Sequence, residues 1–138
     1  MNWLTWALLS AAFAAMTAIL AKLGVSGIDA NLATAIRTSV VVVFTWLIAG
    51  VSGSRGIAAI PGRSWGWLVL SGIATGLSWL CYFHALRVGP ASRVAPIDKL
   101  SVVLVIVFAA LFLGERLTPA KGIGVLLMAA GAIVIATE

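Results

Sequence analysis

Residues Val94–Leu113 read VAPIDKLSVVLVIVFAALFL, and this stretch decides the class of fold. An α-helix of about 20 mostly apolar residues spans the roughly 30 Å hydrocarbon core of a bilayer. The stretch has this length, and it carries two adjacent charged residues, Asp98 and Lys99, before a continuous apolar run. The sequence therefore predicts a membrane-spanning helix with charges inside it.

Four more stretches of the chain have a similar length and apolar content. The five predicted helices cover approximately Trp3–Ala21, Ala30–Gly50, Gly66–Val88, Val94–Leu113 and Pro119–Ala136. The 138-residue chain is 62% hydrophobic and 9% charged, whereas soluble domains are about 25% charged. We therefore predict an all-α polytopic membrane protein in which residues 1–138 form a single transmembrane domain.

An odd number of helices places the two termini on opposite faces of the bilayer. We call the face of the amino terminus side A and the opposite face side B. The basic residues near side A are Arg55, Arg63, Arg116 and Lys121, and those near side B are Lys22, Arg87 and Arg93. Because positive charge sets orientation, a balance of four against three favours a cytoplasmic side A only slightly. Insertion in both orientations stays open.

Three charged residues are expected at a similar depth. The second and fourth helices both run from side B to side A, and Arg37, Asp98 and Lys99 lie about two turns, or roughly 10 Å, inside them. A charge at the centre of a membrane helix costs about 2.5 kcal/mol or more, which is typical of functional residues. Since one carboxylate cannot neutralise two cations, we expect Lys99 to line a water-filled site or to bind an anionic group. An Arg37–Asp98 pair that only joins two helices is the alternative.

Polar and aromatic residues on the second and third helices extend this candidate site. Thr38 belongs to a weakly polar stripe on the second helix, and Trp79 is the one tryptophan expected near the middle of the bilayer. These residues have structural alternatives, because threonine bonds its own helix backbone and tryptophan packs inside bundles. The predicted substrate-binding residues are Lys99, Arg37, Asp98, Thr38, Thr75, Trp79 and Tyr82.

Several classes of function lack candidate residues. The sequence has no nucleophile with a paired base and no zinc-protease motif, and Cys81 stands alone. The basic residues are scattered singly, unlike the basic patches of nucleic-acid-binding proteins. We therefore expect no enzymatic activity, no cofactor, no metal and no nucleic-acid partner.

Two segments resemble the EamA family of the drug/metabolite transporter superfamily. They are ALRVGPASRVAPIDKLS at residues 85–101 and FLGERL at residues 112–117, followed by Gly122 and Gly131 in the last helix. The resemblance covers essentially the whole chain and is to the short single-repeat bacterial and archaeal members. It implies a metabolite exporter or permease and a structural role for Glu115, which would accept loop N–H groups or pair with Arg116.

The resemblance also implies an assembly. Most relatives have ten helices in two inverted repeats around a central cavity, so a five-helix chain needs a second half, most simply a second copy. We predict a secondary transporter of a small polar or anionic metabolite, working by alternating access as an antiparallel homodimer in the bacterial or archaeal inner membrane. The alternatives are a small-multidrug-type cation exporter, which the local excess of positive charge opposes, and a non-transporting scaffold or accessory subunit.

Overall fold

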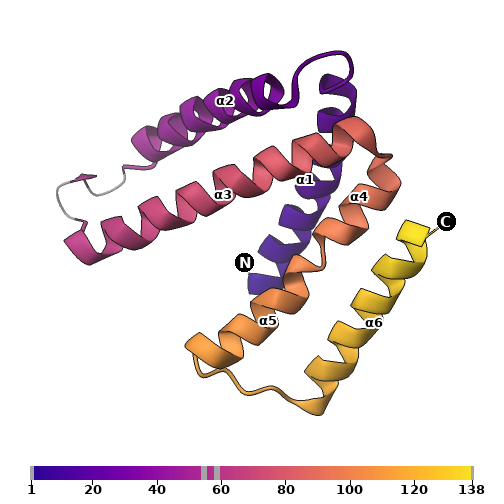
Figure 1. Cartoon of the computed structure of the whole chain (residues 1–138). Coiled ribbons are helices and arrows are strands. Elements are labelled where there is room, and N and C mark those ends of the chain that lie inside the picture. Colours follow the sequence, from indigo (N-terminus) through magenta and orange to yellow (C-terminus); the bar gives the residue numbers. More distant parts are fainter. Residues whose placement is uncertain (1, 54–55, 58–59, 138) are drawn as a thin grey trace. The chain divides into compact units, whose positions relative to one another are not determined.

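The computed structural model describes residues 2–53, 56–57 and 60–137, which contain helices and no strands (Figure 1). The helices are α1 (Trp3–Gly24), α2 (Ala30–Val51), α3 (Gly62–Val88), α4 (Ala91–Asp98), α5 (Ser101–Phe112) and α6 (Pro119–Thr137). Among the described residues, five spans are long and apolar enough to cross a membrane, with α4 and α5 together forming the fourth, Ala91–Phe112. The predicted all-α fold with five spans is confirmed.

The third span begins four residues before the predicted start at Gly66. The carbonyl of Pro61 accepts hydrogen bonds from the N–H groups of Ser64 (2.9 Å) and Trp65 (3.4 Å), so the first helical turn already forms over polar residues. Apolar content marks the part of a helix that lies in lipid, whereas backbone hydrogen bonds set its ends. Arg55, which we predicted near side A, lies outside the described residues.

The fourth span is not one uninterrupted helix, and the prediction was wrong in this detail. Lys99 and Leu100 form a turn between α4 and α5. Across it the N–H of Leu100 bonds the carbonyl of Ile97, and the N–H of Val102 bonds that of Lys99, both at 3.0 Å. Bonds from residue i+3 back to residue i are those of a 3₁₀-helix, and a 3₁₀ segment within a helix often marks a functional hinge. The predicted charges Asp98 and Lys99 lie at this tightened turn.

The chain forms two compact units, residues 1–20 with 88–138 and residues 21–87, and each is described by itself. In the first unit α4 and α5 pack against α6 (Figure 1). Helix α6 begins with Pro119, whose missing N–H costs nothing at a first helical position. The hydroxyl of Thr118 accepts a hydrogen bond from the N–H of Lys121 at 3.3 Å and so caps this end.

The turn after α5 positions Glu115. Gly114 has a φ of +68°, a conformation that residues with a Cβ avoid, and the N–H of Glu115 then bonds the carbonyl of Ala109 at 3.2 Å. Its carboxylate lies 3.6 Å from Nζ of Lys121, at the start of α6. The suggested pairing with Arg116 is therefore replaced by a pairing with Lys121, which joins the turn to α6.

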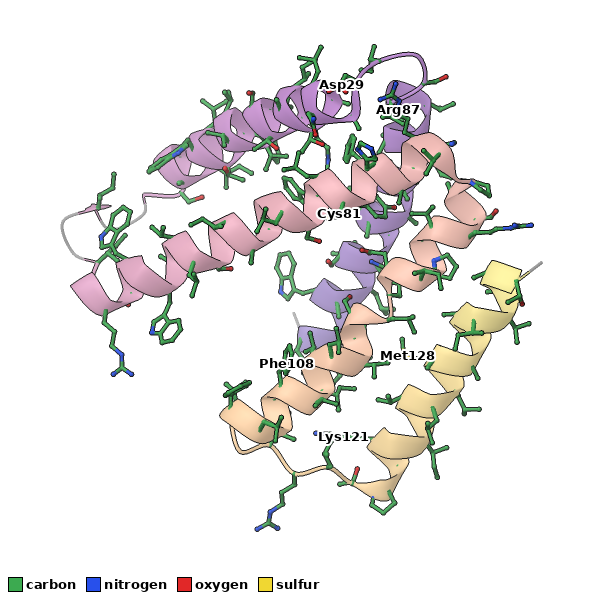
Figure 2. The ribbon with its side chains drawn as sticks, viewed as in Figure 1. Asp29, Cys81, Arg87, Phe108, Lys121 and Met128 are labelled. Carbon is green, nitrogen blue, oxygen red and sulfur yellow. The ribbon has the colours of Figure 1, made fainter. Side chains whose placement is uncertain are left out.

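In the second unit Asp29 and Arg87 connect α2 to α3. Oδ1 of Asp29 accepts hydrogen bonds from the N–H groups of Asn31 (2.9 Å) and Leu32 (3.2 Å) and so caps α2. Oδ2 of the same side chain lies 3.6 Å from the Arg87 guanidinium in the last turn of α3 (Figure 2). Nζ of Lys22 donates to the carbonyl of Leu86, one of the carbonyls that a helix end leaves without a partner. One end of the α2–α3 pair is thereby fixed.

Asp29→Ala is expected to destabilise the protein by about 1 to 2 kcal/mol, because it removes the cap of α2 together with the Arg87 contact. Asp29→Asn keeps an oxygen at the capping position and removes only a solvent-exposed ion pair, so its cost is expected to stay below about 1 kcal/mol. Unfolding in mixed detergent–SDS micelles, followed by circular dichroism, measures both. Equal losses for the two variants would show that the ion pair, not the cap, stabilises this end of α2.

Candidate functional site

Arg37 lies in α2 with aromatic side chains as its partners. Its Cζ atom is 4.2 Å from the centroid of the Trp79 ring and 5.5 Å from that of Phe83, both on α3. The only acidic residue within 21–87 is Asp29, and Asp29 lies against Arg87. Within its own unit, the Arg37 charge is therefore stabilised by the negative faces of aromatic rings rather than by a carboxylate.

The aromatic residues around Arg37 differ from those elsewhere in the chain. Trp79 is half-buried, whereas the other five tryptophans are exposed. Phe83 is 3% exposed, and the ring of Tyr82 meets it edge to face with 6.5 Å between centroids. Tyr82 thus adjoins the Phe83 ring that lies beside Arg37. The structure thus brings together three predicted site residues, Arg37, Trp79 and Tyr82, in one unit.

Asp98 and Lys99 form a second pair of charges, at the turn between α4 and α5. Nζ of Lys99 lies 3.4 Å from Oδ2 of Asp98, and the side chains are 59% and 35% exposed. From the sequence we expected Lys99 to be the cation without a carboxylate, but here Asp98 is its neighbour. The predicted joint cluster of these two residues with Arg37 involves both units and stays a prediction.

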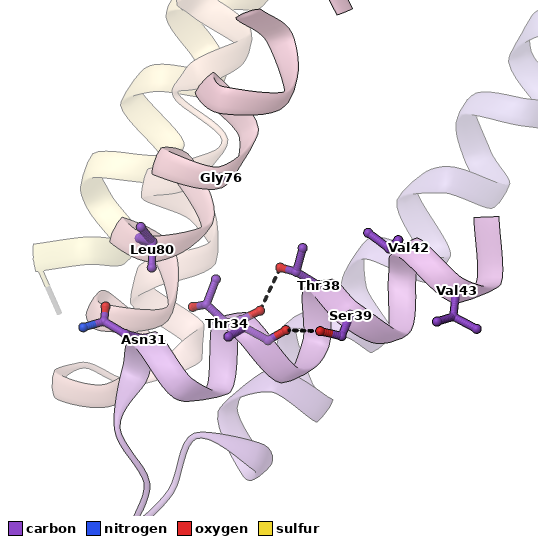
Figure 3. Close-up of a pocket in the computed structure, with 9 residues that line it drawn as sticks. Asn31, Thr34, Thr38, Ser39, Val42, Val43, Gly76 and Leu80 are labelled. Carbon is purple, nitrogen blue, oxygen red and sulfur yellow. Dashed lines mark hydrogen bonds between the residues drawn. The ribbon is translucent and has the colours of Figure 1, made fainter. Parts of the chain in front are cut away.

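An open groove of about 470 Å³ lies between α2 and α3 (Figure 3). It is lined by Asn31, Thr34, Ala35, Thr38, Ser39, Val42, Val43, Gly76 and Leu80. The hydroxyl of Thr34 donates to the carbonyl of Ala30 (2.8 Å), that of Thr38 to Thr34 (2.7 Å) and that of Ser39 to Ala35 (3.0 Å). These hydroxyls keep only acceptor lone pairs for a ligand, so the groove is mainly apolar.

The two predicted threonines differ in position. Thr38 lines the groove, whereas Thr75 is exposed and its hydroxyl donates to the carbonyl of Ser71 at 2.9 Å. Sequence reasoning missed Phe83 as a partner of Arg37. Its position four residues after Trp79 places both rings on one face of α3, and this spacing was the available signal.

Comparison with known proteins supports a transporter. Residues 1–137 match the EamA-like transporter family. A Sinorhizobium protein described as an uncharacterized transporter in the cobO 3' region is 52% identical over 136 residues, which cover 98% of this chain and 96% of the relative. No solved structure matches. The resemblance inferred from residues 85–101 and 112–117 is confirmed.

Proposed function

This chain is an integral multi-pass membrane protein that belongs to the EamA-like transporter family, and from this we propose that it is a secondary transporter of a small polar or anionic organic solute. Both the family and the Sinorhizobium relative are described as transporters. The solute class is our inference from the charges in the spans. The membrane we propose is the bacterial or archaeal inner membrane.

The observation that carries this proposal is the placement of ionisable groups inside apolar spans. Arg37 lies seven residues after the start of α2, and Asp98 seven residues after the start of α4. Each is therefore about 10 Å along its span from the end where the span begins. Each such residue costs about 2.5 kcal/mol or more in lipid, and ionisable residues in spans are typical of solute and ion pathways. A scaffold would use them only to join helices through ion pairs.

The sign of the charge separates this proposal from a lipophilic-cation exporter. Arg37, Asp98 and Lys99 together carry two positive charges and one negative charge. Among them there is therefore no unpaired carboxylate that could bind a cationic solute. Lys99 and Arg37 instead favour a solute with an anionic group. The tightened turn at Lys99–Leu100 is consistent with a site there, because a 3₁₀ segment within a helix often marks a functional hinge.

Alternating access in an antiparallel homodimer would complete the pathway. A single five-span unit provides one half of an inverted repeat, and a second copy in the opposite orientation supplies the other half. The four-against-three balance of basic residues allows both orientations. A parallel dimer would place both sets of charges near the same face and open the cavity to one side only.

Lys99→Ala is expected to reduce solute uptake at least tenfold, a loss of about 1.4 kcal/mol or more of binding free energy, while the protein still folds. Proteoliposomes are incubated with a filtered extract of uniformly ¹³C-labelled bacterial cells, and the labelled solutes that they accumulate are identified by mass spectrometry. Wild-type protein should concentrate particular solutes above the level of empty liposomes.

Lys121→Ala is the matched control, because Lys121 also contacts a carboxylate, that of Glu115 at 3.6 Å, but lies at the start of α6. Its uptake should equal that of the wild type. Undiminished uptake by Lys99→Ala protein would remove Lys99 from the site. Uptake by wild-type protein no higher than by empty liposomes would favour the scaffold alternative.

The antiparallel dimer predicts that both termini are reachable from both sides of the membrane. Single cysteines at Asn2 and Glu138, in a Cys81→Ala background, are labelled in intact cells with an impermeant maleimide and again after permeabilisation. Each terminus should be labelled from outside in a comparable fraction of the molecules, because the charge bias is nearly neutral.

The control is a variant with two further lysines next to Lys121 on side A, which should give a single orientation and lose transport when expressed alone. Labelling of only one terminus from outside in the parent protein would contradict the antiparallel dimer. A parallel dimer, or a different partner chain, would then supply the second half.

A further inference from the structure

We infer that Arg37 is the receptor for a monocarboxylate group of the transported solute and that Trp79 is the residue that positions it. This inference rests on the proposed transport function and specifies the chemistry of its solute. It depends on three features of residues 21–87: the partners of the basic side chains, the contact of Arg37 with Trp79, and the charge that a ligand must bring.

Arg37 differs from the other basic side chains in its partners. Lys22 donates to the carbonyl of Leu86, and the charged groups with carboxylate neighbours are Arg87 with Asp29, Lys99 with Asp98 and Lys121 with Glu115. Arg63 and Arg93 lie in the first turns of α3 and α4, and Arg116 lies between α5 and α6, where water is near. Among the described residues, Arg37 is the basic side chain inside a span that lies over the aromatic rings of Trp79 and Phe83.

The Trp79 contact is to an aromatic ring and not to a carboxylate. Cζ of Arg37 lies over this ring, 4.2 Å from its centroid, and a guanidinium carries five N–H donors in its plane. Two parallel donors of this kind match the two oxygens of a carboxylate. Trp79 and Phe83 therefore position Arg37 without neutralising its charge, which favours a preorganised anion receptor.

The charge of the unit selects a monocarboxylate over a dianion. Arg37 contributes one positive charge in the span, and the other lysine and arginine side chains that the structure describes within residues 21–87, Lys22, Arg63 and Arg87, lie near helix ends. A monocarboxylate gives a neutral pair. A phosphate or phosphonate dianion would leave one uncompensated negative charge in an apolar environment, which is costly.

The test measures binding of isotopically labelled benzoate to the full-length protein in lipid nanodiscs by equilibrium dialysis, with empty nanodiscs subtracted. Binding is measured in alkaline buffer, where phenylphosphonate carries two negative charges. Benzamide has the same shape as benzoate without the charge, so both compounds serve as competitors. We expect saturable benzoate binding, no competition by benzamide, and weaker competition by phenylphosphonate than by unlabelled benzoate.

Four variants separate the receptor from its surroundings. Arg37→Lys keeps the charge but loses the planar pair of donors, and should weaken benzoate binding about tenfold. Trp79→Leu should weaken binding roughly fivefold, and Trp79→Phe by less, because a smaller ring still faces the cation. Arg87→Lys, in the same unit and beside a carboxylate, should bind within about twofold of the wild type.

Four results would overturn the inference: no saturable benzoate binding by the wild type, competition by benzamide as strong as by benzoate, phenylphosphonate competing as well as benzoate, or Arg37→Lys binding as well as Arg87→Lys. If Arg37→Lys does not fold, the Trp79 variants and the competition experiments on the wild type still test whether Arg37 binds the carboxylate. Lys99-dependent uptake of metabolites without benzoate binding would reject Arg37 as a carboxylate receptor but support the transport function. Benzoate binding without any uptake would support the receptor but reject the transport function.

Discussion

Polar groups inside a bilayer need partners within the protein, because lipid offers no hydrogen bonds. This constraint accounts for most of the local contacts of the chain. The hydroxyls of Thr34 and Thr38 donate to carbonyls of their own helix, and Nζ of Lys22 donates to the carbonyl of Leu86 near the end of α3. Arg37 is placed over the aromatic rings of Trp79 and Phe83 instead. Within residues 21–87 no carboxylate lies in the spans to neutralise its charge, which makes it the strongest candidate for an anionic ligand.

The sequence was sufficient to predict the spans, because a span requires an apolar run long enough to cross the lipid core, and the length of such a run is visible in the sequence. It was less informative about helix ends and hydrogen-bond register. The start of α3 at Gly62 depends on the carbonyl of Pro61, and the turn at Lys99–Leu100 depends on a local switch to 3₁₀ hydrogen bonds. Neither changes the apolar content of its stretch, so hydropathy could not detect them.

For the candidate site, the positions of the residues along their helices were predictable from the sequence, but their contacts were not. Counting charges shows that two cations share one carboxylate, yet the count does not say which cation is left over. The structure places Lys99 beside Asp98 and Arg37 over Trp79. That choice depends on which side chains α3 presents to α2, which is a matter of tertiary packing. Phe83 was overlooked for a related reason. Most residues of a membrane helix are apolar, so the sequence does not distinguish a phenylalanine that contacts a cation from one that contacts lipid.

The polar stripe of α2 also has a different meaning once its hydrogen bonds are known. From the sequence, Thr38 was a candidate substrate-binding residue in a weakly polar stripe, with a hydrogen bond to its own helix backbone as the alternative. In the structure the hydroxyl protons of Thr34 and Thr38 are used by the helix backbone, so the groove between α2 and α3 offers mainly apolar contact, together with the Asn31 amide as a polar group. A full negative charge is bound most strongly by charged donors. Recognition of an anionic group is therefore best assigned to the cations in the spans, while the groove suits the apolar remainder of a solute.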